Sequence, residues 1–461
     1  MKRNHRIIWL LLVLLAPTAQ AQLSTLTELN EPIEHVIVRA YTEDISIAYV
    51  NMSRHGYFVV QLPDESFITE LPTNVIVHDM QICEPYLYFC GEIQDTNQGF
   101  VGFVDIQQLY DGIPPWNMYT SFNDVQVSSL KRFIVNEQTA TEIDLVAIGS
   151  TRNGEPFITE IRGPLGVDTN WATTTLVLNQ QNSTAIISEL SDIVVTDNHI
   201  VIGAIYDSDD LGIIPLNRTV LGHNLLDIVT FQSPWQPFYV SYPHEHFEMC
   251  ALNKDTIAIL SFANTGNLPI SSYDGFLLQV LDVHQLRDSI TTFPYPIMGM
   301  CDIQNYFIIS PNNIGDCRIE SLNYVPSYDR LIAVTTGNAP TPNSHEGSIS
   351  VINRATASFD FYYNSYMMMT SVHTLTTSNI FHVAGFEKGA TKLWRLTVDL
   401  DNSLDCLYSY PNLPLDTSFN FTPKLHQNEA NLKHKKQFKF IPVEQLIYQT
   451  SPSTIECKMN Q

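Results

Sequence analysis

A strand pattern that recurs along the chain limits its fold more than any other feature of the sequence. Each copy has an apolar run, a polar turn, a second apolar run ending near a small residue, a variable loop, and a Gly shortly before a third run. The clearest copies are "DMQICEPYLYFCGEIQDTNQGFVGFVDI" (79–106) and "SVHTLTTSNIFHVAGFEKGATKLWRLTVD" (371–399). The runs alternate with period two and are rich in β-branched and aromatic residues, as strands are. The sequence therefore predicts an all-β array of related units.

The glycine before each third run gives the spacing of the repeat. It occurs at Gly56, Gly99, Gly154, Gly212, Gly275, Gly347 and Gly389, with intervals of 43, 55, 58, 63, 72 and 42 residues. Such units match the four-stranded blades of a propeller, which take roughly 40–50 residues plus insertions. Radial packing lets each sheet bury both faces against its neighbours. We therefore expect a single β-propeller of seven four-stranded blades, with a pair of β-sandwich domains as the competing interpretation.

Two parts of the chain leave details of the ring open. The longest interval contains an additional strand-like segment, "CDIQNYFIIS" (301–310), which keeps an eight-bladed ring as an alternative. We place the propeller at 22–400 and a C-terminal extension at 401–461. Either the apolar piece at 441–448 or the N-terminal segment at 34–41 would close the ring and remove its exposed edges. The sequence favours neither.

The first 21 residues have the features of an export signal peptide. Three basic residues precede the apolar run "IIWLLLVLLA" (7–16), and "AQA" (19–21) supplies small residues for cleavage. The run is roughly half the ~20 residues that a membrane-spanning helix needs, and no later stretch is longer. We expect residues 1–21 to be removed and the chain to be exported to the periplasm, the outer surface or the medium, without a transmembrane segment.

The charge of the chain excludes one class of partner. It carries 48 acidic and 24 basic side chains, a formal net charge of −24 at pH 7. An acidic surface repels nucleic acid, which is bound by neutralising its phosphates. The basic stretch 424–440 stands out against this background, and either docks on the acidic body, contacts an anionic surface or is simply solvated. We expect no nucleic-acid partner.

Export favours disulfides. The cysteines after the signal are Cys83, Cys90, Cys250, Cys301, Cys317, Cys406 and Cys457. Because their number is odd, at least one thiol stays free or pairs with another chain. A hairpin turning at Glu84-Pro85 places Cys83 opposite Tyr86 and Cys90 roughly 13 Å away at ~3.4 Å per residue. The limit between bridged Cα atoms is ~7 Å, so Cys83 and Cys90 are predicted not to be joined.

Aromatic residues in two proline-flanked segments, "PPWNMY" (114–119) and "SPWQPFYVSYP" (233–243), form one candidate site. The residues are Trp116, Tyr119, Trp235, Phe238, Tyr239 and Tyr242. In loops between blades they would form a rim on one face of the ring, and Tyr and Trp often dominate binding surfaces. Packing between the blades is the alternative use of such side chains. A rim predicts a protein, peptide or glycan ligand.

Two other segments carry potential metal ligands. His244 and His246 in "YPHEHFEMC" would point to one face of a strand, as half of a metal site. Asp207, Asp209 and Asp210 in "YDSDDLG" place three carboxylates in one loop, which would suit Ca²⁺. The first segment lacks a third ligand and the second lacks the distal Glu of a calcium loop. Solvated polar turns are therefore the simpler interpretation of both.

No nucleophile elbow, His-Glu-x-x-His or phosphate-loop motif is present. The export signal together with "DMQI…YLYFCG…GFVGFVDI" and its weaker echoes resembles uncharacterised secreted β-propeller proteins of Gram-negative bacteria over most of 34–400, although WD40 and kelch signatures are missing. The resemblance implies a fold and a compartment but no active-site residue. We expect an exported binding or scaffolding module that contacts its ligand through inter-blade loops. The alternatives are a carbohydrate-active enzyme with a carboxylate pair near the central channel and a structural subunit of a cell-envelope complex.

Overall fold

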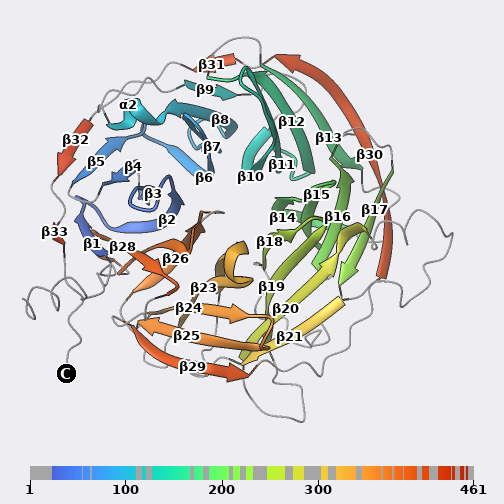
Figure 1. Ribbon diagram of the computed structural model, residues 1–461. Helices are drawn as coiled ribbons and strands as arrows, with labels where there is room; N and C mark the ends of the chain where they lie inside the picture. Colours follow the sequence, from blue (N-terminus) through green and yellow to red (C-terminus); the bar gives the residue numbers. More distant parts are fainter. Residues whose placement is uncertain are drawn as a thin grey trace, which may run out of the picture.

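The chain folds as a ring of seven blades around a central axis, as the computed structural model shows (Figure 1). The structure describes residues 23–454 except 54, 63–64, 111–116, 121–126, 167–170, 180–185, 207–210, 219–224, 232–246, 265–273, 285–302, 310–317, 339–344, 365–366, 376–377, 388, 402–406, 415–423, 438, 442–446 and 451–452. Its helical elements α2 (Ile106–Tyr110) and η1 (Pro326–Tyr328) are short. The fold is all-β, as predicted.

The blades are numbered in chain order, and their strands are given from the axis outward. The first three blades consist of β2 (Ile33–Ala40), β3 (Ser46–Met52), β4 (Gly56–Gln61) and β5 (Ser66–Glu70); of β6 (Val75–Cys83), β7 (Tyr86–Ile93), β8 (Gln98–Asp105) and β9 (Asn117–Thr120); and of β10 (Val127–Gln138), β11 (Glu142–Thr151), β12 (Pro156–Pro164) and β13 (Ala172–Asn179). The fourth and fifth blades consist of β14 (Ile187–Val195), β15 (His199–Tyr206), β16 (Leu211–Asn217) and β17 (Leu225–Phe231), and of β18 (Phe247–Asn253), β19 (Thr256–Asn264), β20 (Asp274–Asp282) and β21 (Ile303–Ile309). The sixth and seventh blades consist of β22 (Arg318–Val325), β23 (Arg330–Asn338), β24 (His345–Asn353) and β25 (Ser358–Asn364), and of β26 (Met368–Thr374), β27 (Ile380–Phe386), β28 (Lys392–Asp399) and β1 (Leu23–Glu28).

The seven-bladed prediction is confirmed. All seven glycines of the repeat lie at, or within three residues of, the start of the third strand of a blade. The extra segment in the longest interval forms β21, the outer strand of the fifth blade, which pairs with β20. An eight-bladed ring and a pair of sandwiches are therefore both wrong.

Apolar side chains fill every interface between neighbouring blades. The buried residues form seven clusters, and each cluster draws its members from two adjacent blades, including the seventh and the first. Between the first and second blades, for example, Tyr49, Phe58, Phe89 and Phe100 are all fully buried. Burying such a side chain stabilises the fold by about 1.5–3 kcal/mol. Each sheet thus obtains from its neighbours the cover that it cannot supply itself.

A β-bulge near the start of most first strands explains the small residue in the repeat. In β6 the pairing with β7 steps from Val77 to Asp79, and six of the seven first strands have such a step at a comparable place. The residue opposite Val77 is Gly91, and a Cβ there would lie 1.9 Å from the carbonyl oxygen of Ile76. Bulges bend a strand and re-aim its side chains. The second strand therefore needs a residue without a side chain beside the bulge.

The ring is closed by a strand from the other end of the chain. β1 pairs antiparallel with β28 along its whole length and supplies the fourth strand of the seventh blade. It lies just upstream of the segment 34–41, which forms the innermost strand of the first blade. The other segment considered for closure, 441–448, contributes to β32 on the outside of the first blade. Closure thus joins residues more than 360 positions apart.

The C-terminal strands run around the outside of the ring as a belt (Figure 1). The belt consists of β29 (Tyr408–Pro414), β30 (Lys424–Gln437), β31 (Lys439–Ile441), β32 (Ile447–Thr450) and β33 (Ser453–Thr454). These strands pair in turn with β25, with β17 and β13, with β9, with β5, and with β1. β30 alone bridges two blades into one nine-stranded sheet. The basic stretch of the sequence is therefore part of the ring's outer edge.

The bulge predicts that substitution by alanine destabilises the protein more at Gly91 than at Gly389. Gly91→Ala places a methyl group against backbone, and we expect it to lower the free energy of unfolding by roughly 3 kcal/mol or more, the upper part of the range for overpacking. Gly389→Ala meets no atom within 4 Å and is strained only by its φ of 76°, which costs about 1–2 kcal/mol. Urea denaturation of both variants measures the difference. Equal losses would contradict the steric role of the bulge.

Candidate functional site

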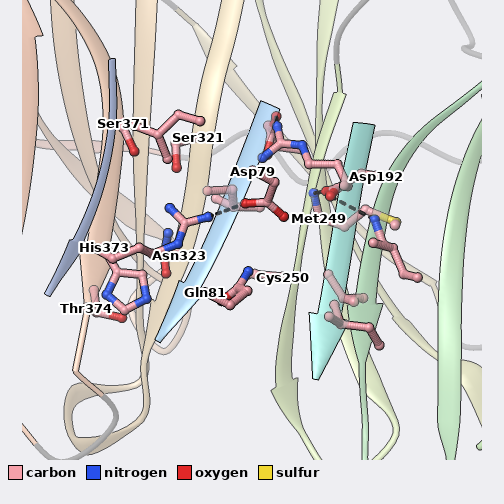
Figure 2. Close-up of a pocket in the computed structure, with 18 of the residues that line it drawn as sticks. Asp79, Gln81, Asp192, Met249, Cys250, Ser321, Asn323, Ser371, His373 and Thr374 are labelled. Atoms are coloured by element: carbon pink, nitrogen blue, oxygen red, sulfur yellow. Dashed lines mark hydrogen bonds and ion pairs between the residues drawn. The ribbon is translucent and has the colours of Figure 1, made fainter. Parts of the chain in front are cut away.

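The first strands of all seven blades line a channel along the axis with a volume of about 560 Å³. Charged side chains project into it from six of these strands: Arg39, Asp79, Arg132, Asp192, Glu248 and Glu320. Figure 2 shows Asp79 of β6 and Asp192 of β14, the strands on either side of β10, with Ser321, Asn323, Ser371 and His373 of β22 and β26 on the left of the view. A polar channel in the middle of an apolar ring is the most distinctive site of the described structure, so its side-chain partners decide what it can do.

Two aspartates tie neighbouring first strands together. Asp79 accepts the N–H of the next residue through Oδ1 at 2.8 Å, and the N–H of Phe133 in β10 through Oδ2 at 3.1 Å. Asp192 repeats this arrangement, with Met249 in β18 as the partner of Oδ2 at 2.6 Å (Figure 2). Both residues directly follow a bulge. The bulges thus turn these carboxylates toward backbone donors of the next blade.

Between the seventh and first blades, a serine hydroxyl in place of a carboxylate accepts a backbone N–H group of the next blade. Ser371 Oγ in β26 accepts the N–H of Val38 in β2 at 3.1 Å, and Thr370 Oγ1 donates to the carbonyl of Val36 at 2.9 Å. Ser371 also follows a bulge. The seventh and first blades are therefore joined at the axis as well as through β1.

Two arginines form ion pairs with acidic side chains of the channel. Arg39 donates through Nη2 to Asp79 Oδ1 at 2.6 Å and through Nε to the carbonyl of Met80 at 2.6 Å. Arg132 donates through Nη2 to Glu248 at 2.6 Å, an ion pair that links the third blade with the fifth. Glu248 in turn raises the pKa of Arg132. Arg132 is thereby held in its charged form, whereas burial lowers the pKa of Arg39 against the opposing effect of Asp79.

The remaining carboxylates are hard to ionise. Burial raises the pKa of Asp192, of Glu248 and of Glu320, against the opposing effect of Arg132 on the first two and of Arg318 on the third. Each of these carboxylates has a partner in the protein. Both oxygens of Asp192 accept backbone N–H groups, and Glu248 binds Arg132. Glu320 accepts a hydrogen bond from the hydroxyl of Thr336 at 2.7 Å. Among the described residues, Asp192 and Glu248 thus link their blades to others, and Glu320 is bonded within its own blade.

Two histidines face each other across β26 and β27 beside the channel. His373 and His382 are directly opposite in the register, and His373 Nδ1 accepts the N–H of Ala40 at 3.1 Å. Burial lowers the pKa of His373 well below its usual value, with Arg39 acting in the same direction, and lowers the pKa of His382 to about 4. Both rings are therefore neutral near pH 7, as the acceptor role of His373 requires.

Charges are more exposed at the end of the channel where the first strands begin. Lys131 forms an ion pair with Glu189, and the two side chains are 34% and 39% exposed. His78 lies 3.5 Å from Glu92, with both side chains about as open to solvent. Lys131 directly precedes Arg132 and His78 directly precedes Asp79, so both pairs adjoin buried charges of the channel along the chain.

Most of the site residues predicted from the sequence lie outside the described residues. This holds for Trp116, Trp235, Phe238, Tyr239 and Tyr242 of the rim, and for His244, His246, Asp207, Asp209 and Asp210 of the metal segments. Tyr119 lies in β9, in register with Val101 and Phe440. The rim and the metal ligands therefore stay predictions.

The described residues include three of the cysteines. Cys83, Cys90 and Cys250 are buried free thiols, so the prediction that Cys83 and Cys90 are not joined is confirmed. Cys83 pairs with Tyr86 across the hairpin, as expected.

In the described part of the chain, no three His, Cys, Asp or Glu side chains are grouped as a metal site. No helix described there has the length and hydropathy to span a membrane.

Comparisons with solved structures add likeness to known folds, of which one example follows. The WD40 domain of SCAP from fission yeast aligns with a TM-score of 0.37 and 10% identity, over 81% of this chain and 96% of that domain. A scan against family models and a search of curated proteins found no match. The assignment of the fold therefore rests on the strand topology itself.

The sequence contains a signal for the channel that the analysis of motifs missed. Asp79 in "DMQI" and Asp192 in "DIVV" occupy the same place in their repeats, at the start of the first apolar run. A carboxylate inside a strand is unusual because strands are depleted in Asp. Its recurrence at one position of the repeat would have indicated a shared structural partner. The ion pair of Arg132 with Glu248 has no such signal, because the two are 116 residues apart.

Removing the shared cation should destabilise the ring. We expect Arg132→Met to lower the free energy of unfolding at pH 8 by on the order of 3 kcal/mol, because the buried carboxylates of Asp192 and Glu248 then lose their cation. Their pKa values in the folded state already lie above the usual ones, so this loss grows as pH rises through them and shrinks as pH falls. Urea denaturation at pH 5 and pH 8 measures the effect.

A second substitution serves as the control for that variant. Adding Glu248→Gln to Arg132→Met removes the unpaired charge, so the double variant should be more stable than the single one at pH 8. A double variant that is less stable than Arg132→Met would contradict the assigned pairing.

The buried histidines predict a loss of stability in mild acid. A pKa of about 4 for His382 in the folded state, against ~6.5 in the unfolded chain, means that its contribution is present above pH 6.5 and lost as pH falls toward 4. Since one pKa unit is ~1.4 kcal/mol, this loss is about 3 kcal/mol. His382→Asn should reduce the pH dependence of unfolding by that amount, while the same change at the exposed His284 should not. Identical slopes for wild type and His382→Asn would rule the assignment out.

Proposed function

We propose that the chain is an exported β-propeller that binds or scaffolds a partner, contacted by the inter-blade connections around one end of the channel. The observation that carries this proposal is the commitment of the channel carboxylates. Asp79, Asp192 and Glu248 bind backbone N–H groups or arginines of the protein itself. A ring whose centre is used for its own cohesion presents a rigid frame, and binding residues usually lie on the loops of such a frame.

The strand directions favour one end of the ring for this role. All neighbouring strands in a blade are antiparallel, so the connection from β17 to β18 (232–246) begins and ends where the first strands start. The connection from β8 to β9 belongs to the other end. The first of these ends also has the exposed pairs Lys131–Glu189 and His78–Glu92. We therefore assign the ligand to the end with Trp235, Phe238, Tyr239 and Tyr242, and treat Trp116 and Tyr119 as separate from it.

The chemistry at this end suits a protein or peptide, with a glycan as the second ligand class. Aromatic residues beside charged pairs supply apolar contact together with orienting charges, a combination typical of binding surfaces. The enzyme alternative has less support, because a carboxylate pair for glycoside hydrolysis needs two acids free to act on the substrate. The envelope-subunit alternative depends on a C-terminal extension that reaches a partner. The described belt strands instead pair with the chain's own blades.

Export is part of the proposal and is tested with the full-length chain. Expression in a Gram-negative host should yield protein outside the cytoplasm, with a mass that lacks residues 1–21. Recovery of the intact chain from the cytoplasm would contradict export.

Binding is tested with the purified mature protein on peptide and glycan arrays. We expect Trp235→Ala and Tyr242→Ala each to weaken the wild-type signal about tenfold or more, since hot-spot aromatics contribute at least ~1.4–2 kcal/mol. Trp116→Ala removes a matched aromatic side chain from the other end of the ring and should leave binding unchanged. Silence on both arrays, or equal loss with Trp116→Ala, would overturn the assignment of the binding end.

A further inference from the structure

The central channel has a second level of side chains, beyond the charged one and closer to the end where the first strands finish. Gln81, Asn323 and His373 each come two residues after the residue that follows a bulge, so they face the channel one step further along their strands. All three line the channel, and Figure 2 shows them below Asp79 and Asp192. They therefore lie toward the end of the channel that is remote from the connection between β17 and β18.

This second level has a polar side and an apolar side. The neighbouring strands β22, β26, β2 and β6 supply side chains with hydrogen-bonding groups, namely Asn323, His373, Arg39 and Gln81. The next three strands around the axis, β10, β14 and β18, supply Ile134, Val194 and Cys250. Burial raises the pKa of the Cys250 thiol, so this side chain is neutral as well. A ligand at this level meets hydrogen-bonding groups on one side and apolar groups on the other.

The proton of the His373 ring has a fixed position. Nδ1 accepts the N–H of Ala40 at 3.1 Å, and burial holds the pKa of His373 well below its usual value. A neutral imidazole that accepts at Nδ1 carries its proton on Nε2. Within the described residues Nε2–H has no acceptor, and it is not among the unpartnered polar atoms that are closed off from solvent. His373 therefore offers one oriented donor to the channel.

Two amides complete the polar side. Asn323 donates Nδ2–H to the carbonyl of Val372 at 2.8 Å, which fixes the amide and leaves Oδ1 as an acceptor without a partner among the described residues. The amide of Gln81 has no partner there either. Both side chains are half-buried, and neither amide has an atom that is closed off from solvent. Partly buried amides without partners gain most from a ligand that bonds to them.

The ionisable groups near this level are engaged or exposed. Arg39 donates to Asp79 and to the backbone carbonyls of Val38 and Met80. Glu84, which also lines this end, is exposed in the turn after β6. The groups left for a ligand are neutral donors and acceptors, which favours an uncharged ligand that carries both.

We propose that this end of the channel binds a neutral sugar unit of monosaccharide size. A pyranose ring has hydroxyl groups around its edge, each able to donate and to accept, and C–H groups on its faces. Its hydroxyls bond to Asn323 Oδ1, the Gln81 amide and His373 Nε2–H, and one C–H face lies against Ile134 and Val194. The channel volume of about 560 Å³ is within the ~300–1,000 Å³ of ligand pockets. This site does not depend on the partner proposed for the other end of the ring.

The experiment titrates the mature protein with D-glucose, D-galactose and N-acetyl-D-glucosamine by calorimetry. Methyl NMR signals of Ile134 and Val194, on the apolar side, report occupancy of the site. We expect at least one sugar to bind and to shift these signals. Uracil, a neutral ring with amide groups, and D-glucuronate, an anionic sugar, are the comparison probes, and both should bind more weakly than the best sugar. No binding of any of the three sugars at millimolar concentration, or tighter binding of either comparison probe, would overturn the proposal.

Two pairs of variants assign the binding to the polar side. Gln81→Ala should weaken sugar binding about fivefold, the effect of losing one neutral hydrogen bond. Gln94→Ala removes a matched side chain from the exposed turn between β7 and β8 and should have no effect. Asn323→Ala should weaken binding by a similar factor. Ser321→Ala, which removes the hydroxyl that also donates to the Val372 carbonyl at 3.3 Å, should leave binding unchanged. Equal affinities within either pair would contradict the assigned contacts.

Discussion

Every blade of this protein depends on its two neighbours, because a four-stranded sheet has two apolar faces and can cover neither by itself. The seven clusters of buried side chains lie between blades and not within them. Six interfaces follow from the order of the chain, but the seventh exists only if the last blade meets the first. The pairing of β1 with β28 provides that meeting, and the cluster that includes Val36, Val38, Ala384 and Phe386 fills it.

Closing the ring creates the second constraint, which is a crowded axis. Seven first strands meet there, and each is an edge strand of its sheet, so N–H groups on its inner edge have no partner strand. Asp79, Asp192 and Ser371 accept such groups from the following blade. Arginines then balance the acids, since a buried carboxylate without a cation or donors would be destabilising. The polar channel is therefore a consequence of how the ring is assembled, and ligand binding is better placed at its ends.

The sequence predicted the fold well because the repeat carries local physical requirements. A residue without a side chain is needed opposite the bulge at Gly91, Gly149 and Gly385, and this produced the small residue that recurs in the second, third and seventh units. The partners of the closing strand and of the belt could not be predicted, because strands as short as β31 and β33 have no pattern that indicates a partner hundreds of residues away. The pairing of Arg132 with Glu248 was hidden for the same reason.

The belt retraces the ring in reverse order, from the sixth blade through the fourth, third, second and first to the seventh. A linear repeat array can fold from any point and lose its terminal units one at a time. Here β33 pairs with β1, so a strand from the start of the chain has a partner from its end. The contacts that complete the ring and its belt therefore join the two ends of the chain, and they are among the longest in sequence that the chain can make.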